Sequence, residues 1–139
     1  LIHFLDPFEV LMHGELRILR CEICHQTFDL MEEKHLTEQY VSCPSCDSER
    51  LRPHIVWFHE MPLKMAEIYA AVEECDVFIT IGTSGHVYPA AGLIDVAKQA
   101  GATCVGINLE PPMNIAQHDE FHQGKAGELL PRMVEKIVN

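Results

Sequence analysis

Short apolar runs alternate with amphipathic segments from residue 53 to the end of the chain. The runs "HIVWF" (54–58), "DVFITIG" (76–82) and "TCVGINL" (103–109) are rich in β-branched residues and predict buried strands. The segments "PLKMAEIYAAVEEC", "PAAGLIDVAKQAG" and "GELLPRMVEKIVN" carry apolar residues at helical spacing. We expect Gly101 to close the second helix, and Pro62 and Pro131 to lie in first turns. This order predicts parallel strands with right-handed crossovers, in which the run at 76–82 is a central strand.

The residues before position 53 follow a different pattern. A lead-in, residues 1–20, runs into the strand-like "ELRILRC", and residues 21–52 are polar with almost no apolar periodicity. Such a segment cannot bury a core of its own and needs a cross-link. We therefore expect an α/β chain in three parts: the lead-in 1–20, a zinc-ribbon module at 21–52, and a partial Rossmann-like parallel sheet with helices at 53–139.

Charge and composition narrow the classes of partner. The 139 residues are 47% apolar, and 21 acidic against 10 basic residues give a formal net charge of −11. Such a surface repels nucleic acid and anionic membranes, so neither is an expected partner, whereas a lysine-bearing peptide is compatible. No apolar run has the length of a membrane span and no signal peptide is visible, which favours a cytoplasmic protein. The chain begins "LIHFLDPFEV" without Met and is expected to be an excised, processed or incomplete product.

Four of the six cysteines form two CxxC pairs. Cys21 and Cys24, and after eighteen residues Cys43 and Cys46, have the spacing of a tetrahedral S4 site that suits one structural Zn²⁺ in a reducing compartment. Reactive redox cysteines are the alternative. His25 and His35 are expected to be surface residues. Cys75 and Cys104 are expected to be small buried apolar residues.

Polar residues follow two of the predicted strands. In "ITIGTSGHVYPAA", Gly82, Thr83 and Ser84 come between a strand and a helix, where ligands bind in open α/β sheets. Alone this pattern is weak, and a plain βα turn explains it equally well. The next strand ends in "INLEP", and two adjacent strand ends with ligand-competent residues, here including Asn108 and Glu110, favour a nucleotide site. The pair His118 and His122 in "HDEFH" is expected in a solvated loop.

Together these stretches resemble one family. "MHGEL", the CxxC…CPSC pair, "LRPHIVWFHEMPL", "IGTSGHVYPAAG", "INLEP" and "GKA" occur in the order found in sirtuins, the NAD-dependent protein lysine deacylases, and most resemble the bacterial class with broad acyl specificity. The resemblance covers residues 12–139.

The resemblance implies an activity of deacetylase or desuccinylase type, in which an acyl-lysine protein or peptide and NAD give free lysine, nicotinamide and O-acyl-ADP-ribose. His13, of the HG motif, would be the general base on the ribose hydroxyls, a role for which histidine is suited. Without the resemblance, a lone histidine there reads more simply as a turn or core residue. The other implied site residues are Gly82, Thr83 and Ser84 on the NAD ribose and phosphate; Asn108, Leu109 and Glu110 on the adenosine ribose; Ala126 against adenine; and Val56, Trp57 and Phe58 along the acyl-lysine tunnel, pairing with the substrate peptide.

Two departures from the family bear on activity. The GAGxS loop and the QN-[IV]-D stretch do not occur in this sequence, so only about half of the NAD site is present, and we expect little or no turnover from this chain alone. The family's FGE reads "FHE", with His59 at the glycine position, where a side chain obstructs the peptide, imposes a strained backbone if φ is positive, or is harmlessly exposed. The alternative function is a non-catalytic, zinc-stapled remnant that binds a nucleotide or a partner.

Overall fold

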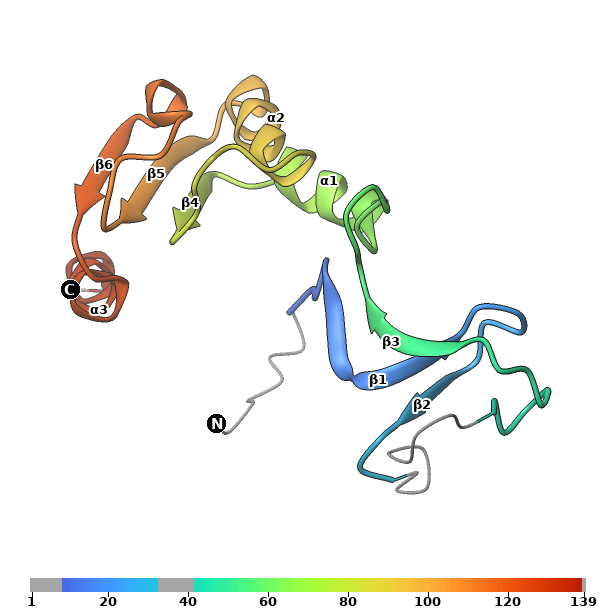
Figure 1. The fold of residues 1–139 in the computed structure, drawn as a ribbon. Coiled ribbons are helices and arrows are strands. Elements are labelled where there is room, and N and C mark those ends of the chain that lie inside the picture. The colour runs from blue at the N-terminus through green and yellow to red at the C-terminus, as the bar shows by residue number, and fades with distance from the viewer. Residues whose placement is uncertain (1–8, 33–41, 139) are drawn as a thin grey trace. The chain divides into compact units, whose positions relative to one another are not determined.

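The chain forms two compact units, unit 1 spanning Leu1–Met65 and unit 2 spanning Ala66–Asn139. The computed structural model describes residues 9–32 and 42–138 (Figure 1). The expected surface position of His35, and the acidic Glu33 and Glu38, lie outside these residues. The sequence-based division into 1–20, 21–52 and 53–139 stays a prediction, and the structure itself divides the chain once, after Met65.

Unit 1 is built on a three-stranded antiparallel sheet in the order β2-β1-β3. The predicted strand "ELRILRC" is confirmed as β1 (Gly14–Cys21), which pairs on one side with β2 (Thr27–Asp29) and on the other with β3 (Leu51–Ile55). Its buried apolar residues, among those described, are only Leu19, Cys21 and Cys43. This apolar core is too small to hold the sheet by itself, in keeping with the cross-link expected for the polar segment.

The strand predicted at 54–58 is displaced in the structure. β3 begins and ends three residues earlier and pairs antiparallel with β1, rather than opening the parallel sheet. Trp57 and Phe58 lie beyond its end and are 53% and 92% exposed. Their apolar character suggested burial, but the chain turns here, and the N–H of Glu60 donates to the carbonyl oxygen of Trp57 across 3.0 Å. The prediction of a buried, parallel strand at this position was therefore wrong.

Unit 2 has the Rossmann-like pattern that the sequence predicted, with a parallel sheet in the order β4-β5-β6 and packed helices. The two strands predicted at 76–82 and 103–109 are confirmed, and α2 packs against both. Gly101 ends α2 in the left-handed conformation, with φ of +93°, as expected of a C-terminal glycine. The elements in chain order are α1 (Met65–Glu73), β4 (Val77–Ile81), α2 (Leu93–Ala100), β5 (Thr103–Asn108), β6 (Glu120–Gln123) and α3 (Ala126–Val138).

Three details of unit 2 differ from expectation. The central strand is β5 rather than β4, because "HDEFH" forms most of a third strand, β6, instead of a solvated loop. Pro62 precedes α1 rather than lying within it. Pro131 lies inside α3, which begins at Ala126, so this proline is past the first turn. Polar residues at 119 and 120 hid the β6 strand, since one side of an edge strand tolerates them.

The core of unit 2 lies between α2 and the sheet. Ile94 and Ala97 of α2 are almost completely buried, as are Cys104 and Ile107 of β5. The prediction of a buried apolar Cys104 is confirmed, whereas Cys75 is half-buried. On β4, by contrast, Val77, Ile79 and Ile81 are 53%, 41% and 45% exposed, so one row of this strand is apolar and uncovered among the described residues.

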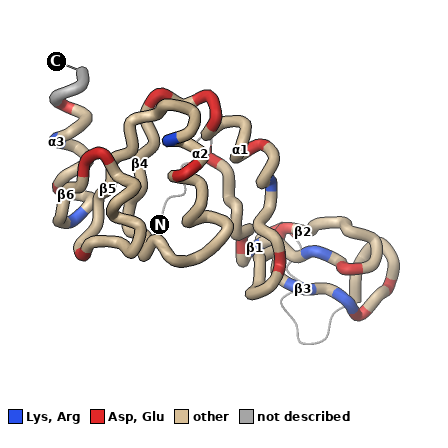
Figure 2. Tube along the Cα trace, turned by 90° about the horizontal axis from the view of Figure 1, so that it is seen from above, with Lys and Arg blue, Asp and Glu red and all other residues tan. Residues whose placement is uncertain are grey.

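Charged residues are interspersed rather than segregated. Acidic and basic residues both occur along the sheet of unit 1 (Figure 2). Arg17 pairs with Glu15 at 3.1 Å and with Asp29 at 2.9 Å, and Arg50 pairs with Glu22 at 2.7 Å.

Within the described residues, no helix has the length and apolar character required to cross a membrane.

Candidate active site and metal centre

The four cysteines of the two CxxC pairs meet at one point in unit 1. Their Sγ atoms all lie within 4.8 Å of one another. The Sγ atoms of Cys21 and Cys46 are 3.7 Å apart, and those of Cys24 and Cys43 are 3.6 Å apart. A zinc–sulfur bond of about 2.3 Å puts the corners of an S4 tetrahedron about 3.8 Å apart. The cluster therefore has the spacing that a tetrahedral zinc ion requires.

Two similar turns aim these thiols at the common point. In the first, the N–H of His25 donates to the carbonyl oxygen of Cys21 across 3.0 Å; in the second, the N–H of Asp47 donates to that of Cys43 across 2.8 Å. His25 and Asp47 both have positive φ, of 61° and 56°. Each turn thus closes on a left-handed residue directly after the second cysteine, a conformation that His and Asp adopt more readily than most residues.

The thiols of the cluster differ in pKa: burial and the neighbouring thiols raise the pKa values of Cys24 and Cys46, whereas the pKa of Cys21 is lowered. The backbone N–H of Cys24, aided by that of Ile23 and opposed by burial, lowers the pKa of Cys21 to about 6. A thiol of lowered pKa is readily a thiolate, the form that binds zinc. With four sulfur ligands no position is left for a substrate, so the site fits a structural ion. His25 is exposed and not part of the cluster, as expected.

The predicted catalytic histidine, His13, lies in an exposed turn directly before β1. The glycine that follows it is required by the fold. Gly14 has φ of +78°, and a Cβ atom at this position would collide with the backbone carbonyl oxygen of His54 on β3. The close approach of β3 therefore explains why glycine must follow the histidine.

The segment predicted to bind the peptide lies beside this turn. The N–H of Val56 donates to the carbonyl oxygen of His13 across 2.9 Å, and the N–H of Leu63 donates to that of Met12 across 2.8 Å. Val56 is half-buried, whereas the side chains of Trp57 and Phe58 are exposed. Within unit 1 the structure thus brings the predicted base and the predicted peptide segment together through their backbones.

His59, which replaces the family's glycine, has φ of +72°. This is the left-handed region, which glycine adopts freely and which costs other L-residues about 1–2 kcal/mol. The concern that a side chain at this position imposes a strained backbone is borne out by this conformation.

In unit 2 the ends of β4 and β5 border one hollow of about 450 Å³. It is lined by every residue predicted for the NAD ribose and phosphate, Gly82, Thr83 and Ser84, and by those predicted for the adenosine ribose, Asn108, Leu109 and Glu110. Gly82 has φ of +65°, which glycine permits. The strand-end position thus gathers two of the predicted residue groups in one place.

Some polar groups of this hollow are hydrogen-bonded to one another, and others have no partner among the described residues. The amide of Asn108 donates to the carbonyl oxygen of Thr83, and its Oδ1 accepts from the N–H of Leu109. The hydroxyl of Thr83 accepts from the N–H of Gly85. Ser84 and Glu110, in contrast, have exposed side chains with no polar partner among the described residues. Together with the exposed His86, which also lines the hollow and has no polar partner among the described residues, these two side chains are available to a ligand.

Ala126 does not line this hollow. It borders a second, apolar one together with Ile81 and four further residues of α3, namely Gly127, Leu130, Pro131 and Val134. The structure therefore leaves Ala126 apart from the other predicted nucleotide residues, beside an apolar surface that suits the face of a flat ring.

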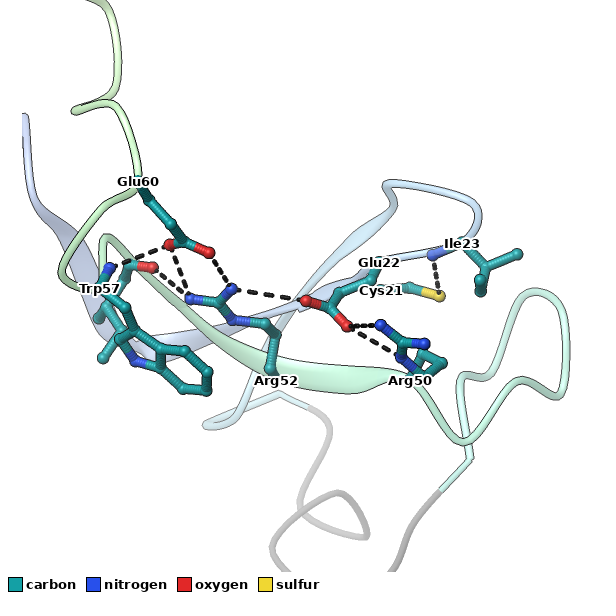
Figure 3. Close-up of polar contacts among 8 residues, drawn as sticks. Cys21, Glu22, Ile23, Arg50, Arg52, Trp57 and Glu60 are labelled. Carbon is teal, nitrogen blue, oxygen red and sulfur yellow. Dashed lines mark hydrogen bonds and ion pairs between the residues drawn. The ribbon is translucent and has the colours of Figure 1, made fainter.

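The candidate site residues predicted above do not include Arg52 and Glu60. Arg52 is buried on β3, and its guanidinium binds the carboxylate of Glu60 and stacks on Trp57 (Figure 3). The available signal was an arginine inside an otherwise apolar run, "LRPHIVWF", since a charge in such a run is seldom buried without a partner. His86 and Met113, which line the strand-end hollow, were also missed.

Residues 9–89 match the Sir2 family. The NAD-dependent protein deacylase of Shewanella oneidensis is 48% identical over 128 residues, which cover 91% of this chain and 51% of that protein. The protein of the same name from Vibrio cholerae is 47% identical over 128 residues, with the same two shares. The chain thus spans about half the length of the curated relatives it matches.

Solved structures agree with this. A Sir2 homologue in complex with NAD matches with a TM-score of 0.80 and 36% identity, over 92% of this chain and 51% of that one. Sir2Af2 bound to a myristoylated histone peptide matches with a TM-score of 0.73 and 37% identity, over 91% of this chain and 55% of that one.

Proposed function

Since the chain belongs to the Sir2 family, the sirtuins, we propose that it carries part of the active site of an NAD-dependent protein lysine deacylase. The observation that carries the proposal is the hydrogen bond from Val56 to His13, which joins the candidate base to the candidate peptide segment. The names of the relatives, and the NAD and acyl-peptide complexes among the structural neighbours, support the same reaction.

The residues of unit 1 would handle the peptide. An acyl-lysine peptide would lie along the backbone at Val56–Phe58 and pair with the groups still free there, because the N–H groups of Val56 and Trp57 are already bonded to His13 and Glu60. The exposed rings of Trp57 and Phe58 shield the acyl chain from water. A ring nitrogen of His13 accepts a proton from a ribose hydroxyl, after which the acyl group leaves the lysine. The acyl group is of the acetyl or succinyl type.

The residues of unit 2 would hold the nucleotide. The carboxylate of Glu110 accepts hydrogen bonds from ribose hydroxyls, and the hydroxyl of Ser84 and the N–H groups around Gly82 donate to ribose or phosphate oxygens. Ala126 contributes an apolar surface to the adenine. When bound, NAD supplies an electrophilic ribose carbon that accepts the acyl oxygen as nicotinamide departs.

The four cysteines, in this proposal, hold one structural zinc ion that keeps unit 1 folded. Thiolates that bind zinc persist in a reducing compartment, which supports the cytoplasm as its location. The three parts proposed for the sequence then have distinct tasks: 1–20 carries the base, 21–52 the metal, and 53–139 the peptide segment and the nucleotide.

Calorimetric titration of NAD into the purified, zinc-loaded chain tests the proposal. We expect saturable binding that is weakened by Glu110→Gln and Ser84→Ala but not by His13→Ala, because His13 acts on the bound ribose rather than holding it. Absence of NAD binding by a folded, zinc-containing chain would contradict the nucleotide half of the proposal. It would favour the alternative, a zinc-stapled module that binds a partner without turnover.

Release of nicotinamide and O-acyl-ADP-ribose from NAD and an acetyl- or succinyl-lysine peptide, followed by mass spectrometry, tests the chemistry. The measurement is made on the purified, zinc-loaded chain. We expect little or no turnover from the chain alone. Wherever turnover occurs, we expect His13→Ala to abolish it while NAD binding persists. Equal turnover by His13→Ala and the parent protein would contradict the assigned base.

A further inference from the structure

Arg52 is the one charged or polar residue that the structure buries, among the described residues, with 8% of its surface exposed. Removing a guanidinium from water is costly, and partner carboxylates repay the cost only in part. Its Nε also has no hydrogen-bond partner in the described part of the chain. A buried cation that lacks one of its hydrogen bonds contributes little to the stability of the fold. The contacts of the guanidinium therefore indicate a further role for Arg52.

The guanidinium of Arg52 closes the turn that follows β3. Its Nη1 donates to Oε1 of Glu60 across 2.6 Å, and its Nη2 donates to Oε2 of Glu60 across 3.1 Å and to the carbonyl oxygen of Ile55 across 2.9 Å (Figure 3). This two-pronged pairing lowers the pKa of Glu60 to about 2, with help from the N–H of Trp57. The carboxylate is thus charged and fixed, and it anchors the far end of the turn.

The same pair of residues sets the orientation of Trp57. The carbon at the centre of the guanidinium lies 3.8 Å from the centroid of the Trp57 ring, and the N–H of Trp57 donates to Oε2 of Glu60 across 2.9 Å. Figure 3 shows the indole ring beside the guanidinium, while the carboxylate of Glu60 meets the backbone of the same residue. Side chain and backbone of Trp57 are therefore both held, although its side chain is half exposed.

A second carboxylate connects Arg52 to the metal cluster. Glu22, which follows Cys21, reaches Nη1 of Arg52 at 3.5 Å and is held on its other side by Arg50 at 2.7 Å. The backbone of Cys21 lies opposite Leu51 in the sheet. A continuous series of contacts therefore leads from a cysteine of the cluster, through Glu22 and Arg52, to Trp57.

We propose that Arg52 is a positioning residue for the peptide segment. Its guanidinium holds Trp57 and, through the turn closed by Glu60, the neighbouring Phe58 in the conformation that receives an acyl-lysine peptide. Glu22 links Arg52 to the cysteine cluster. Trp57 is therefore ordered when the cluster holds its metal ion and less ordered when it does not. The peptide part of this inference rests on the proposed deacylase function, whereas the ordering of Trp57 does not.

Lysine cannot replace arginine in this role. One ammonium group cannot make two parallel bonds to Glu60 and at the same time reach Ile55 and stack flat on an indole ring. Arg52→Lys therefore keeps the charge but loses the geometry. Arg50→Lys is the matched control, because Arg50 is exposed and, among the described residues, its side chain bonds only to Glu22.

The chain contains a single tryptophan, so its fluorescence reports Trp57 alone. With zinc-loaded Arg52→Lys we expect a red-shifted emission and stronger acrylamide quenching than in the parent chain, with zinc content and circular dichroism unchanged. Binding of an acetyl-lysine peptide should weaken about tenfold, the equivalent of about 1.4 kcal/mol, because Trp57 is no longer held in place. Arg50→Lys should leave both measurements at parent values. Chelation of zinc should shift Trp57 emission in the parent chain and less so in Glu22→Gln.

A folded, zinc-containing Arg52→Lys with parental emission, quenching and peptide affinity would overturn the proposal. If Arg52→Lys fails to fold, the test is made with Glu60→Gln, which keeps the buried guanidinium and removes only the charge of the Glu60 carboxylate. Trp57 emission equal to that of the parent chain in Glu60→Gln would also overturn the proposal. If the parent chain binds no acyl-lysine peptide, the proposed function is contradicted for this chain, and the Trp57 measurements still judge the positioning role by themselves.

Discussion

The side-chain amide of Asn108 donates a hydrogen bond to the backbone carbonyl oxygen of Thr83 across 2.6 Å. The bond joins the end of β5 to the loop that follows β4, and Oδ1 of the same side chain fixes the N–H of Leu109. We expect Asn108→Ala to lower the free energy of unfolding by about 1–2 kcal/mol, the worth of one or two such bonds. NAD affinity should also fall, because both walls of the hollow move. Thermal unfolding and calorimetry on one preparation measure the two effects.

Ser84→Ala is the matched control for this prediction. Its hydroxyl has no partner among the described residues, so the variant should unfold at the parental temperature while binding NAD less tightly. Equal loss of stability in both variants would contradict the division between residues that build the hollow and residues that face the ligand.

Cys43 and Cys104 are both fully buried, but only Cys43 belongs to the metal cluster. We expect Cys43→Ser to lose bound zinc and the structure of unit 1, whose apolar core is small and depends on the ion. Cys104→Ser should keep one zinc per chain. Metal content by mass spectrometry, together with Trp57 emission as a measure of unit 1, distinguishes the two. Full zinc occupancy in Cys43→Ser would show that the four thiols are not the ligand set.

Gly106 lies at the middle of the sheet in unit 2, beneath two rings. A Cβ atom there would come within 2.8 Å of His118 and 2.9 Å of Phe121. We expect Gly106→Ala to destabilise unit 2 by about 1–3 kcal/mol through overpacking. Gly127→Ala is the control, since nothing lies within 4 Å of its Cβ position in α3, and it should be neutral or stabilising by up to about 1 kcal/mol. Helical circular dichroism in urea measures both variants.

Asp119 makes the stability of unit 2 depend on pH. The ammonium of Lys98 at 2.8 Å, and the N–H of Cys104, hold the pKa of this carboxyl below its ordinary value of 3.8. A carboxyl whose pKa is lower in the folded state stabilises the fold above its ordinary pKa and ceases to do so as pH falls through the folded value.

Asp119→Asn should therefore be less stable than the parent chain at pH 7, and the difference should shrink as pH falls below 3.8. Urea unfolding followed by helical circular dichroism reports on unit 2, because α2 and α3 lie there. Asp76→Asn, at an exposed carboxylate, should show no such trend. A difference that stays constant from pH 7 to the acid limit would refute the role given to Asp119.

His59 tests the cost of the left-handed turn. Its φ of +72° is easy for glycine, tolerable for histidine and poor for a β-branched residue. We expect His59→Val to lose about 1–2 kcal/mol, and His59→Gly to remain within about 1 kcal/mol of the parent, since relief of strain is offset by the greater freedom of glycine in the unfolded chain. Thermal unfolding of the zinc-loaded chain gives the order. A fully stable His59→Val would mean that this turn is not rigidly held by Glu60.

Where one physical signal dominated, the fold could be predicted from the sequence. The β-branched runs before Gly82 and at Thr103–Asn108 gave two strands correctly, and the two CxxC pairs gave the metal cluster, because four thiols at this spacing have few other arrangements. Gly101 gave the end of α2, since a left-handed helix terminus favours glycine.

The errors arose where apolar character did not mean burial. Trp57 and Phe58 are apolar but exposed, because the chain turns after Ile55, so reading them as core displaced the predicted strand toward the C-terminus. The reverse held at Glu120–Gln123, where a polar stretch forms β6 through backbone pairing with β5. An arginine inside an apolar run was a local signal of burial, but no local pattern could identify its partner, because Glu60 lies on the far side of a turn.

Because position 14 requires glycine, substitutions there would score like those at the neighbouring His13. In a saturation scan scored by activity, every substitution at Gly14 should be depleted as strongly as those at His13. The similar scores would come from unrelated failures, one of proton transfer and one of strand packing against His54. Only a parallel scan scored by abundance would separate the two, since it would retain the His13 variants and discard those at Gly14.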